Sequence, residues 1–131
     1  WLMAAKRHDP DLLLKTSYHM NFAETWIKEN QAFIESSIDR YAALDMDALV
    51  HLMKAFFDLN ITDQLKTIQA PTLVVAGEKD LIKGQEYARI ICDQITNSEL
   101  ALIPDAGHAL CIEKPAIVNS LILGFVIKHS M

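Results

Sequence analysis

A chain of 131 residues with 51% hydrophobic and 22% charged residues has the size and composition of one folded domain, which excludes an intrinsically disordered protein. Its net charge is −5 and its Lys and Arg residues are scattered, whereas nucleic-acid binding needs a concentrated basic surface, so no nucleic-acid partner is expected. The strongly apolar tract at 121–127 is far shorter than the roughly 20 residues of a membrane span, so no membrane association is expected.

The first helix signals appear between residues 9 and 43. Asp9 before Pro10 is typical of an N-cap followed by a proline at the first helical position, where the missing N–H costs nothing. Asn21 stands three residues before Glu24, which resembles a capping box. Apolar residues then recur at roughly helical spacing, and they predict one long or broken helix over about 22–43.

Asp45 is predicted to be the N-cap of a third helix, in which several apolar residues share one face. The first 58 residues are therefore expected to be helical. Large apolar side chains at helical spacing can line a substrate pocket, but they more commonly form a core, and we interpret them as core. These residues are Trp26, Phe33, Met53, Phe56 and Phe57.

The second half of the chain alternates strand and helix patterns. "TLVVA" at 72–76 is a short, continuous apolar run, typical of a strand that is buried on both faces of a parallel sheet. A helix is expected from 84 to 95 and a second strand, "ELALI", at 99–103. The 22 residues from 77 to 98 are long enough for the crossover that two parallel strands need.

Pro115 predicts the start of a final helix, because proline favours the first helical position. The two helices of this half are expected to cover the sheet with apolar side chains. These side chains are Tyr87, Ala88, Ile91, Ile95, Val118, Leu121, Ile122, Phe125 and Val126.

Two loops carry the candidate chemistry. Asp80 follows the first predicted strand and His108 follows the second. The carboxyl ends of parallel strands meet at one edge of a sheet, so these two side chains are expected to lie close together. A carboxylate beside an imidazole is the orienting half of a nucleophilic triad. Taken singly, Asp80 is also explained as a turn or cap residue and His108 as a hydrogen-bonded surface residue.

Two blocks of the sequence carry a resemblance to a known family. "IQAPTLVVAGEKD", residues 68–80, is similar to the penultimate strand and acid loop of the α/β-hydrolase superfamily. "ELALIPDAGHALCIEKPAIVNSLILGFV", residues 99–126, is similar to its last strand, histidine loop and final helix. The resemblance implies an α/β fold class, the C-terminal portion of an α/β-hydrolase fold. A helical, cap-like region at 1–58 would precede a parallel β-α-β-α unit at 59–131.

Asp80 and His108 match by position the acid and the base of the superfamily's triad. The resemblance implies a hydrolase that cleaves ester, thioester or amide bonds of a small-molecule substrate without a cofactor. The superfamily's G-x-S-x-G nucleophile elbow does not occur in this sequence, and "LIKG" stands where many relatives have a Val-Pro pair after the acid. We therefore expect a fragment that lacks its nucleophile, serine or aspartate, and is inactive alone. The alternative is a noncatalytic ligand-binding or interaction module on the same scaffold.

Three further acidic residues have simpler interpretations. Glu113 lies just before Pro115 and is interpreted as capping the final helix rather than as a second acid. Asp105 is expected to form a turn with Pro104, and Asp63 to begin a short helical turn.

Metal, redox and assembly properties follow from the remaining residues. Cys92 and Cys111 lack metal-ligand spacing and are expected to be buried, reduced thiols; with no secretory leader pattern, we expect a cytoplasmic location. The resembled fold would leave the 72–76 strand with an open edge, so a homodimer is expected. No metal site is expected, because the other histidines lack partners at ligand spacing. They are His8, His19, His51 and His129.

Overall fold

A computed structural model of the chain describes residues 1–130. The chain divides into two compact units. The first unit comprises Trp1–His19 and Ile27–Asn60, and the second comprises Met20–Trp26 together with the chain from Ile61 onward. The assignment of the helical region as a cap stays a prediction.

The first unit is helical, and two of its predicted helix starts are confirmed. The Asp9 carboxylate accepts a hydrogen bond from the Leu12 N–H at 2.9 Å, and the Asp45 carboxylate accepts one from the Ala48 N–H at 2.9 Å. Both therefore satisfy an N–H group that a helix start leaves open. The helices of residues 1–60 are α1 (Leu2–Lys6), α2 (Pro10–Asn21), α3 (Glu24–Glu29), α4 (Gln31–Glu35), α5 (Ile38–Ala42) and α6 (Met46–Asp58).

The helical stretch predicted over 22–43 is broken into α3, α4 and α5. Serine hydroxyls explain the break between α4 and α5, because the Phe33 carbonyl accepts from the Ser36 hydroxyl at 2.8 Å and from the Ser37 hydroxyl at 3.0 Å. Side chains that bond the backbone in this way compete with the helix ladder. The capping box predicted at Asn21 is wrong, since Asn21 is the last residue of α2.

The predicted core role of three aromatic residues, Phe33 of α4 and Phe56 and Phe57 of α6, is also wrong. Phe56 and Phe57 are 55% and 71% exposed, and Phe33 is 37% exposed. The core of this unit instead gathers Ala4 and Ala5 of α1 with Leu13 and Met46. No pattern in the sequence had predicted α1, which packs against α6 through small side chains.

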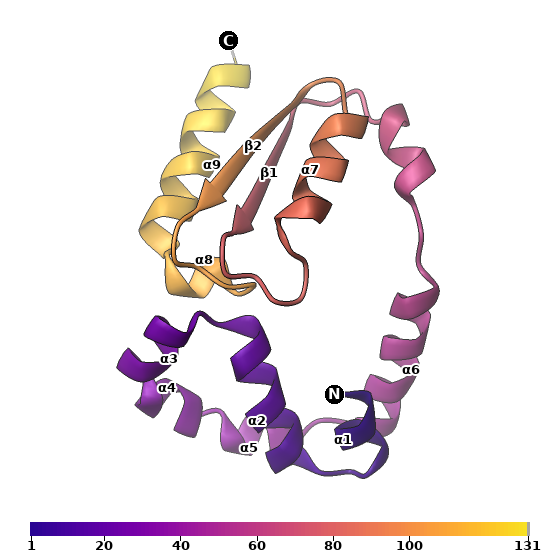
Figure 1. Ribbon diagram of the computed structural model, residues 1–131, viewed down its shortest axis with the longest axis vertical. Coiled ribbons are helices and arrows are strands. Elements are labelled where there is room, and N and C mark those ends of the chain that lie inside the picture. Colours follow the sequence, from indigo (N-terminus) through magenta and orange to yellow (C-terminus); the bar gives the residue numbers. More distant parts are fainter. Residues whose placement is uncertain (131) are drawn as a thin grey trace. The chain divides into compact units, whose positions relative to one another are not determined.

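The second unit contains the predicted β-α-β element. Strand β1 (Thr72–Gly77) pairs in parallel with β2 (Ser98–Ile103), in a register that runs from Thr72↔Ser98 to Gly77↔Ile103. The crossover contains α7 (Gln85–Gln94), and the chain ends in α9 (Pro115–His129) with Pro115 at its start. Figure 1 shows α7 and α9 on the two sides of the strand pair. Two short elements complete the unit, the 3₁₀ helix η1 (Thr62–Thr67) and α8 (Leu110–Glu113).

Burial in the second unit is lower than the sequence had predicted. The sequence predicts that β1 is buried on both faces, but its first four residues are only half-buried. The reason is that the sheet of the described chain has two strands. Tyr87 is 47% exposed, and Ile122 and Val126 of α9 are also exposed. Cys92 and Cys111 are both free thiols, but Cys92 is half-buried and Cys111 is exposed, so the prediction of buried thiols is wrong.

Candidate active site

The loops that leave β1 and β2 are joined to each other by backbone hydrogen bonds. The Glu78 N–H donates to the Ile103 carbonyl at 3.0 Å, and the Lys79 N–H donates to the Ala106 carbonyl at 2.8 Å. The loop after β1 carries Asp80 and the loop after β2 carries His108. The two predicted site residues therefore stand on neighbouring, mutually bonded loops.

Gly77 makes this close approach possible. It is the last residue of β1 and is buried. A Cβ atom at this position would overlap the carbonyl oxygens of Ala106 and Gly107 and would lie 2.7 Å from the Ala106 carbonyl carbon. Contacts this short with backbone atoms cannot be relieved by turning a side chain, so the approach of the two loops requires a residue without a side chain.

The Asp80 carboxylate is held by three hydrogen bonds. Its Oδ1 accepts the Ile82 N–H and the Lys83 N–H, both at 2.8 Å, and its Oδ2 lies 2.9 Å from Nδ1 of His108. The side chain of Asp80 is 6% exposed, whereas that of His108 is 42% exposed. A buried acid thus stands behind an accessible base.

The pairing sets the roles of the two imidazole nitrogens. An ionised carboxylate carries no proton and can only accept, so Nδ1 of His108 is the donor towards Asp80. In the neutral ring, the proton on Nδ1 leaves the lone pair on Nε2. His108 can therefore take a proton at Nε2 while Asp80 stabilises the positive charge that results.

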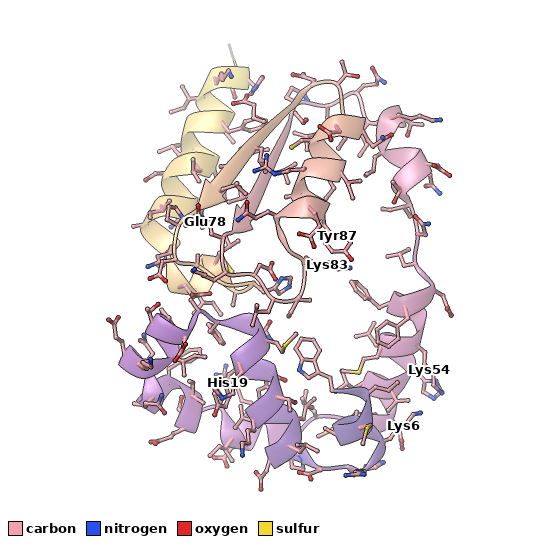
Figure 2. The ribbon with its side chains drawn as sticks, in the orientation of Figure 1. Lys6, His19, Lys54, Glu78, Lys83 and Tyr87 are labelled. Carbon is pink, nitrogen blue, oxygen red and sulfur yellow. The ribbon has the colours of Figure 1, made fainter. Side chains whose placement is uncertain are left out.

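Further along the acid loop, Lys83 and Tyr87 lie beside each other at the start of α7 (Figure 2). Nζ of Lys83 is 4.7 Å from the centroid of the Tyr87 ring, which is within cation–π range. Tyr87 is 47% exposed and does not cover the sheet, although the sequence had predicted that it would.

Glu113 has a different position from the one predicted. It is the last residue of α8, and the first turn of α9 receives no side-chain capping bond from the described residues, so its interpretation as a cap for the final helix is wrong. Its buried carboxylate accepts the Gly107 N–H at 2.8 Å and the Ala23 N–H at 3.0 Å. Sequence reasoning missed this contact with residue 23, because the partners are 90 residues apart and no local pattern joins them.

The other two acidic predictions, for Asp105 and Asp63, are confirmed. Asp105 adopts a left-handed backbone with φ of 49°, as a turn residue can, and its carboxylate accepts the Thr25 hydroxyl at 3.0 Å. Asp63 lies in the first turn of η1, as predicted.

Within residues 1–130, no group of three or more His, Cys, Asp or Glu side chains is placed to hold a metal ion. None of the helices in the same residues combines the length and the apolar character that a membrane span needs.

The sequence of the chain is similar to those of known hydrolases and related proteins. No protein-family model matches it. The chain is 36% identical over 89 residues to the proline iminopeptidase PfmaB of Pestalotiopsis fici, a match that covers 68% of this chain and 30% of the relative. It is 33% identical over 76 residues to the AB hydrolase superfamily protein YisY of Bacillus subtilis, covering 58% of this chain and 28% of the relative.

A solved structure extends the likeness to nearly the whole chain. The α/β-hydrolase enzyme MGS-M2, from a Medee basin deep-sea metagenome library, matches with a TM-score of 0.82 and 22% identity over 95% of this chain and 47% of its own. This chain belongs to the α/β-hydrolase superfamily. It spans less than half the length of the relatives it matches, and it corresponds to the C-terminal portion of the α/β-hydrolase fold.

Proposed function

We propose that this chain supplies the acid and the base of a nucleophile-His-acid triad, in an α/β-hydrolase that cleaves ester, thioester or amide bonds of a small-molecule substrate. One observation carries the proposal. Oδ2 of Asp80 and Nδ1 of His108, on the loops that follow the two parallel strands, lie 2.9 Å apart, and the acid side chain is buried while the imidazole is accessible. A carboxylate that only formed a turn would not need an imidazole on its second oxygen.

In the proposed mechanism, Nε2 of His108 takes the proton of the nucleophile as the nucleophile attacks the substrate carbonyl. The same nitrogen then returns the proton to the leaving group. Asp80 keeps the ring in the tautomer that places the lone pair on Nε2, and its charge stabilises the imidazolium. Its own two N–H contacts, from Ile82 and Lys83, keep the carboxylate in place while the ring changes charge.

The nucleophile and the oxyanion donors would come from outside these residues. None of the glycines in the chain flanks a serine in the G-x-S-x-G spacing, and the matched relatives are more than twice as long as the matched segment. We therefore expect the chain by itself not to turn over substrate. A serine nucleophile would give ester, thioester or amide hydrolysis, and the likeness to a protein named as an iminopeptidase favours this class.

The experiment uses the product of the complete reading frame that encodes this chain. With p-nitrophenyl butyrate as substrate, His108→Ala should lower kcat by about 10⁴-fold or more, while His51→Ala, on the exposed face of α6, should leave it unchanged. Labelling by a fluorophosphonate would identify a serine nucleophile. Equal rates for the His108→Ala and wild-type proteins would contradict the proposal and favour a noncatalytic module on the same scaffold.

Assembly and location are secondary proposals. Among the described strands, β1 pairs with β2 on one edge, and its other edge has no partner strand. The helix α9 exposes Leu123 and Ile127. We therefore propose a homodimer that forms through the open strand edge or through the apolar helices. Sedimentation as a stable monomer at tens of micromolar would contradict it. The free thiols support a reducing, cytoplasmic location, and the acidic net charge supports the absence of a nucleic-acid partner.

A further inference from the structure

Glu113 is a buried carboxylate that the proposed mechanism does not use. It is 8% exposed. Its Oε1 accepts the Gly107 N–H at 2.8 Å and its Oε2 accepts the Ala23 N–H at 3.0 Å. One carboxylate therefore joins the residue before His108 to Ala23, which is 90 residues from Glu113 in the sequence.

The partners of Glu113 belong to a larger set of bonds between two segments. We call residues 21–25 the strap and residues 104–109 the histidine loop. The Ala109 N–H donates to the Asn21 carbonyl at 2.8 Å, and the Thr25 hydroxyl donates to the Asp105 carboxylate at 3.0 Å. The histidine loop is therefore bonded to the strap directly at two residues and through Glu113 at a third.

These bonds hold the backbone on both sides of His108. The N–H of Gly107 bonds Glu113 and the N–H of Ala109 bonds the strap. On the other face of the loop, the Ala106 carbonyl accepts the Lys79 N–H at 2.8 Å from the acid loop. Because the residues on both sides are held in this way, the backbone of His108 has little freedom to move. Its ring therefore stays within reach of Asp80.

Gly107 fits this arrangement closely. A Cβ atom at Gly107 would lie 2.7 Å from the Asn21 carbonyl oxygen, 2.9 Å from the Ala23 nitrogen and 2.9 Å from Oε1 of Glu113. The glycine before His108 thus allows the strap and the carboxylate to reach the loop backbone. A buried carboxylate is costly unless its oxygens are bonded, and here each oxygen serves a different segment. An apolar side chain could fill the same space, but it could not join the two N–H groups.

We propose that Glu113 is a positioning residue for His108: its carboxylate clamps the histidine loop to the strap, and so directs Nδ1 towards Asp80 and Nε2 outward. The purpose of this positioning rests on the proposed function, because a ring that moves no proton needs no fixed direction. The clamp itself can be measured without any substrate.

The test compares Glu113→Gln with wild type by amide hydrogen exchange and by NMR of the His108 ring. A glutamine has one acceptor oxygen and turns an NH₂ group towards the other N–H, so at least one of the two bonds is lost. A bond to a charged acceptor slows local opening by about tenfold or more, so the Gly107 and Ala23 amides should exchange at least about tenfold faster in the variant. The signal of the His108 Nδ1 proton should exchange with water faster by a similar factor, while the amides of the β1–β2 ladder keep their rates.

Glu78→Gln is the matched control. It removes the same charge from an exposed position at the start of the acid loop (Figure 2) and should leave the Gly107 amide and the His108 signal unchanged. The proposal is overturned if the Gly107 and Ala23 amides exchange freely in the wild-type chain, which needs no variant. It is also overturned if Glu113→Gln leaves the His108 signal as in wild type, whether the other amides change or not.

The exchange test and the activity test have separate outcomes. Activity that survives His108→Ala would remove the proposed function and leave the clamp standing as a feature of the loop. Activity that needs His108, together with an unchanged ring signal in Glu113→Gln, would remove the clamp and leave the proposed function standing.

Discussion

Replacing Gly77 with alanine should separate the two loops that carry Asp80 and His108. The new Cβ would overlap the carbonyl oxygens of Ala106 and Gly107, so the backbone must move. Overpacking of a buried position costs about 1–3 kcal/mol. The movement also breaks the bond from the Lys79 N–H to the Ala106 carbonyl, which is worth about 1 kcal/mol. We therefore expect Gly77→Ala to lower the free energy of unfolding by about 2–4 kcal/mol.

Urea unfolding measures this loss, and Gly124→Ala is its control. Gly124 lies within α9, and a Cβ there would meet nothing within 4 Å. The same substitution at this site should raise the free energy of unfolding by about 0.5–1 kcal/mol, because alanine loses less backbone entropy in a helix. A Gly77→Ala protein within about 0.5 kcal/mol of wild type would refute the steric argument, since the two loops would then approach without needing a glycine.

Two further predictions concern the helix start at Asp45 and the ion pairs of Glu99. Asp45→Ala removes the acceptor of the Ala48 N–H and should cost about 1 kcal/mol in thermal unfolding, while Asp45→Asn should cost much less; equal losses would argue against capping. The hydrogen bonds from Lys128 and then His129 hold the pKa of Glu99 below its ordinary value of 4.5. Because the folded pKa is the lower one, the stabilisation is present above pH 4.5 and is lost as the pH falls through the folded pKa. The difference in unfolding free energy between wild type and Glu99→Gln should therefore shrink as the pH is lowered from 7 to 3. A difference that stays constant would contradict the stabilising role of the Glu99 ion pairs.

The sequence was sufficient for the features that depend on nearby residues. Asp9 and Asp45 cap helices because the capping contact spans only three residues. The parallel β1–β2 pair follows from two apolar runs with a crossover of sufficient length between them. Once the strands are parallel, the loops that follow them meet at one edge, which is why Asp80 and His108 could be paired before any coordinates.

The features that the sequence did not predict depend on distant contacts. The apolar stripe of α6 looks like core, yet Phe57 is exposed, and the core of this unit gathers the small residues of α1 with Met46. Glu113 looks like a cap for the helix that follows it, yet its carboxylate bonds Ala23, and only the fold brings these residues together. Helical periodicity shows that residues share a face, but it does not show what covers that face.

The central claim is that Asp80 and His108 act as one unit in proton transfer, and a double-mutant cycle tests it most directly. The kcat/KM of the complete reading-frame product would be measured for wild type, Asp80→Asn, His108→Ala and the double variant. In Asp80→Asn, the oxygen of the new amide can still accept the Ile82 and Lys83 N–H groups, but its NH₂ group would face Nδ1 and force the wrong tautomer on His108. We predict a loss of about 10⁴-fold for Asp80→Asn, and no further loss when it is added to His108→Ala. Losses that multiply in the double variant, or an Asp80→Asn protein within about tenfold of wild type, would contradict the account.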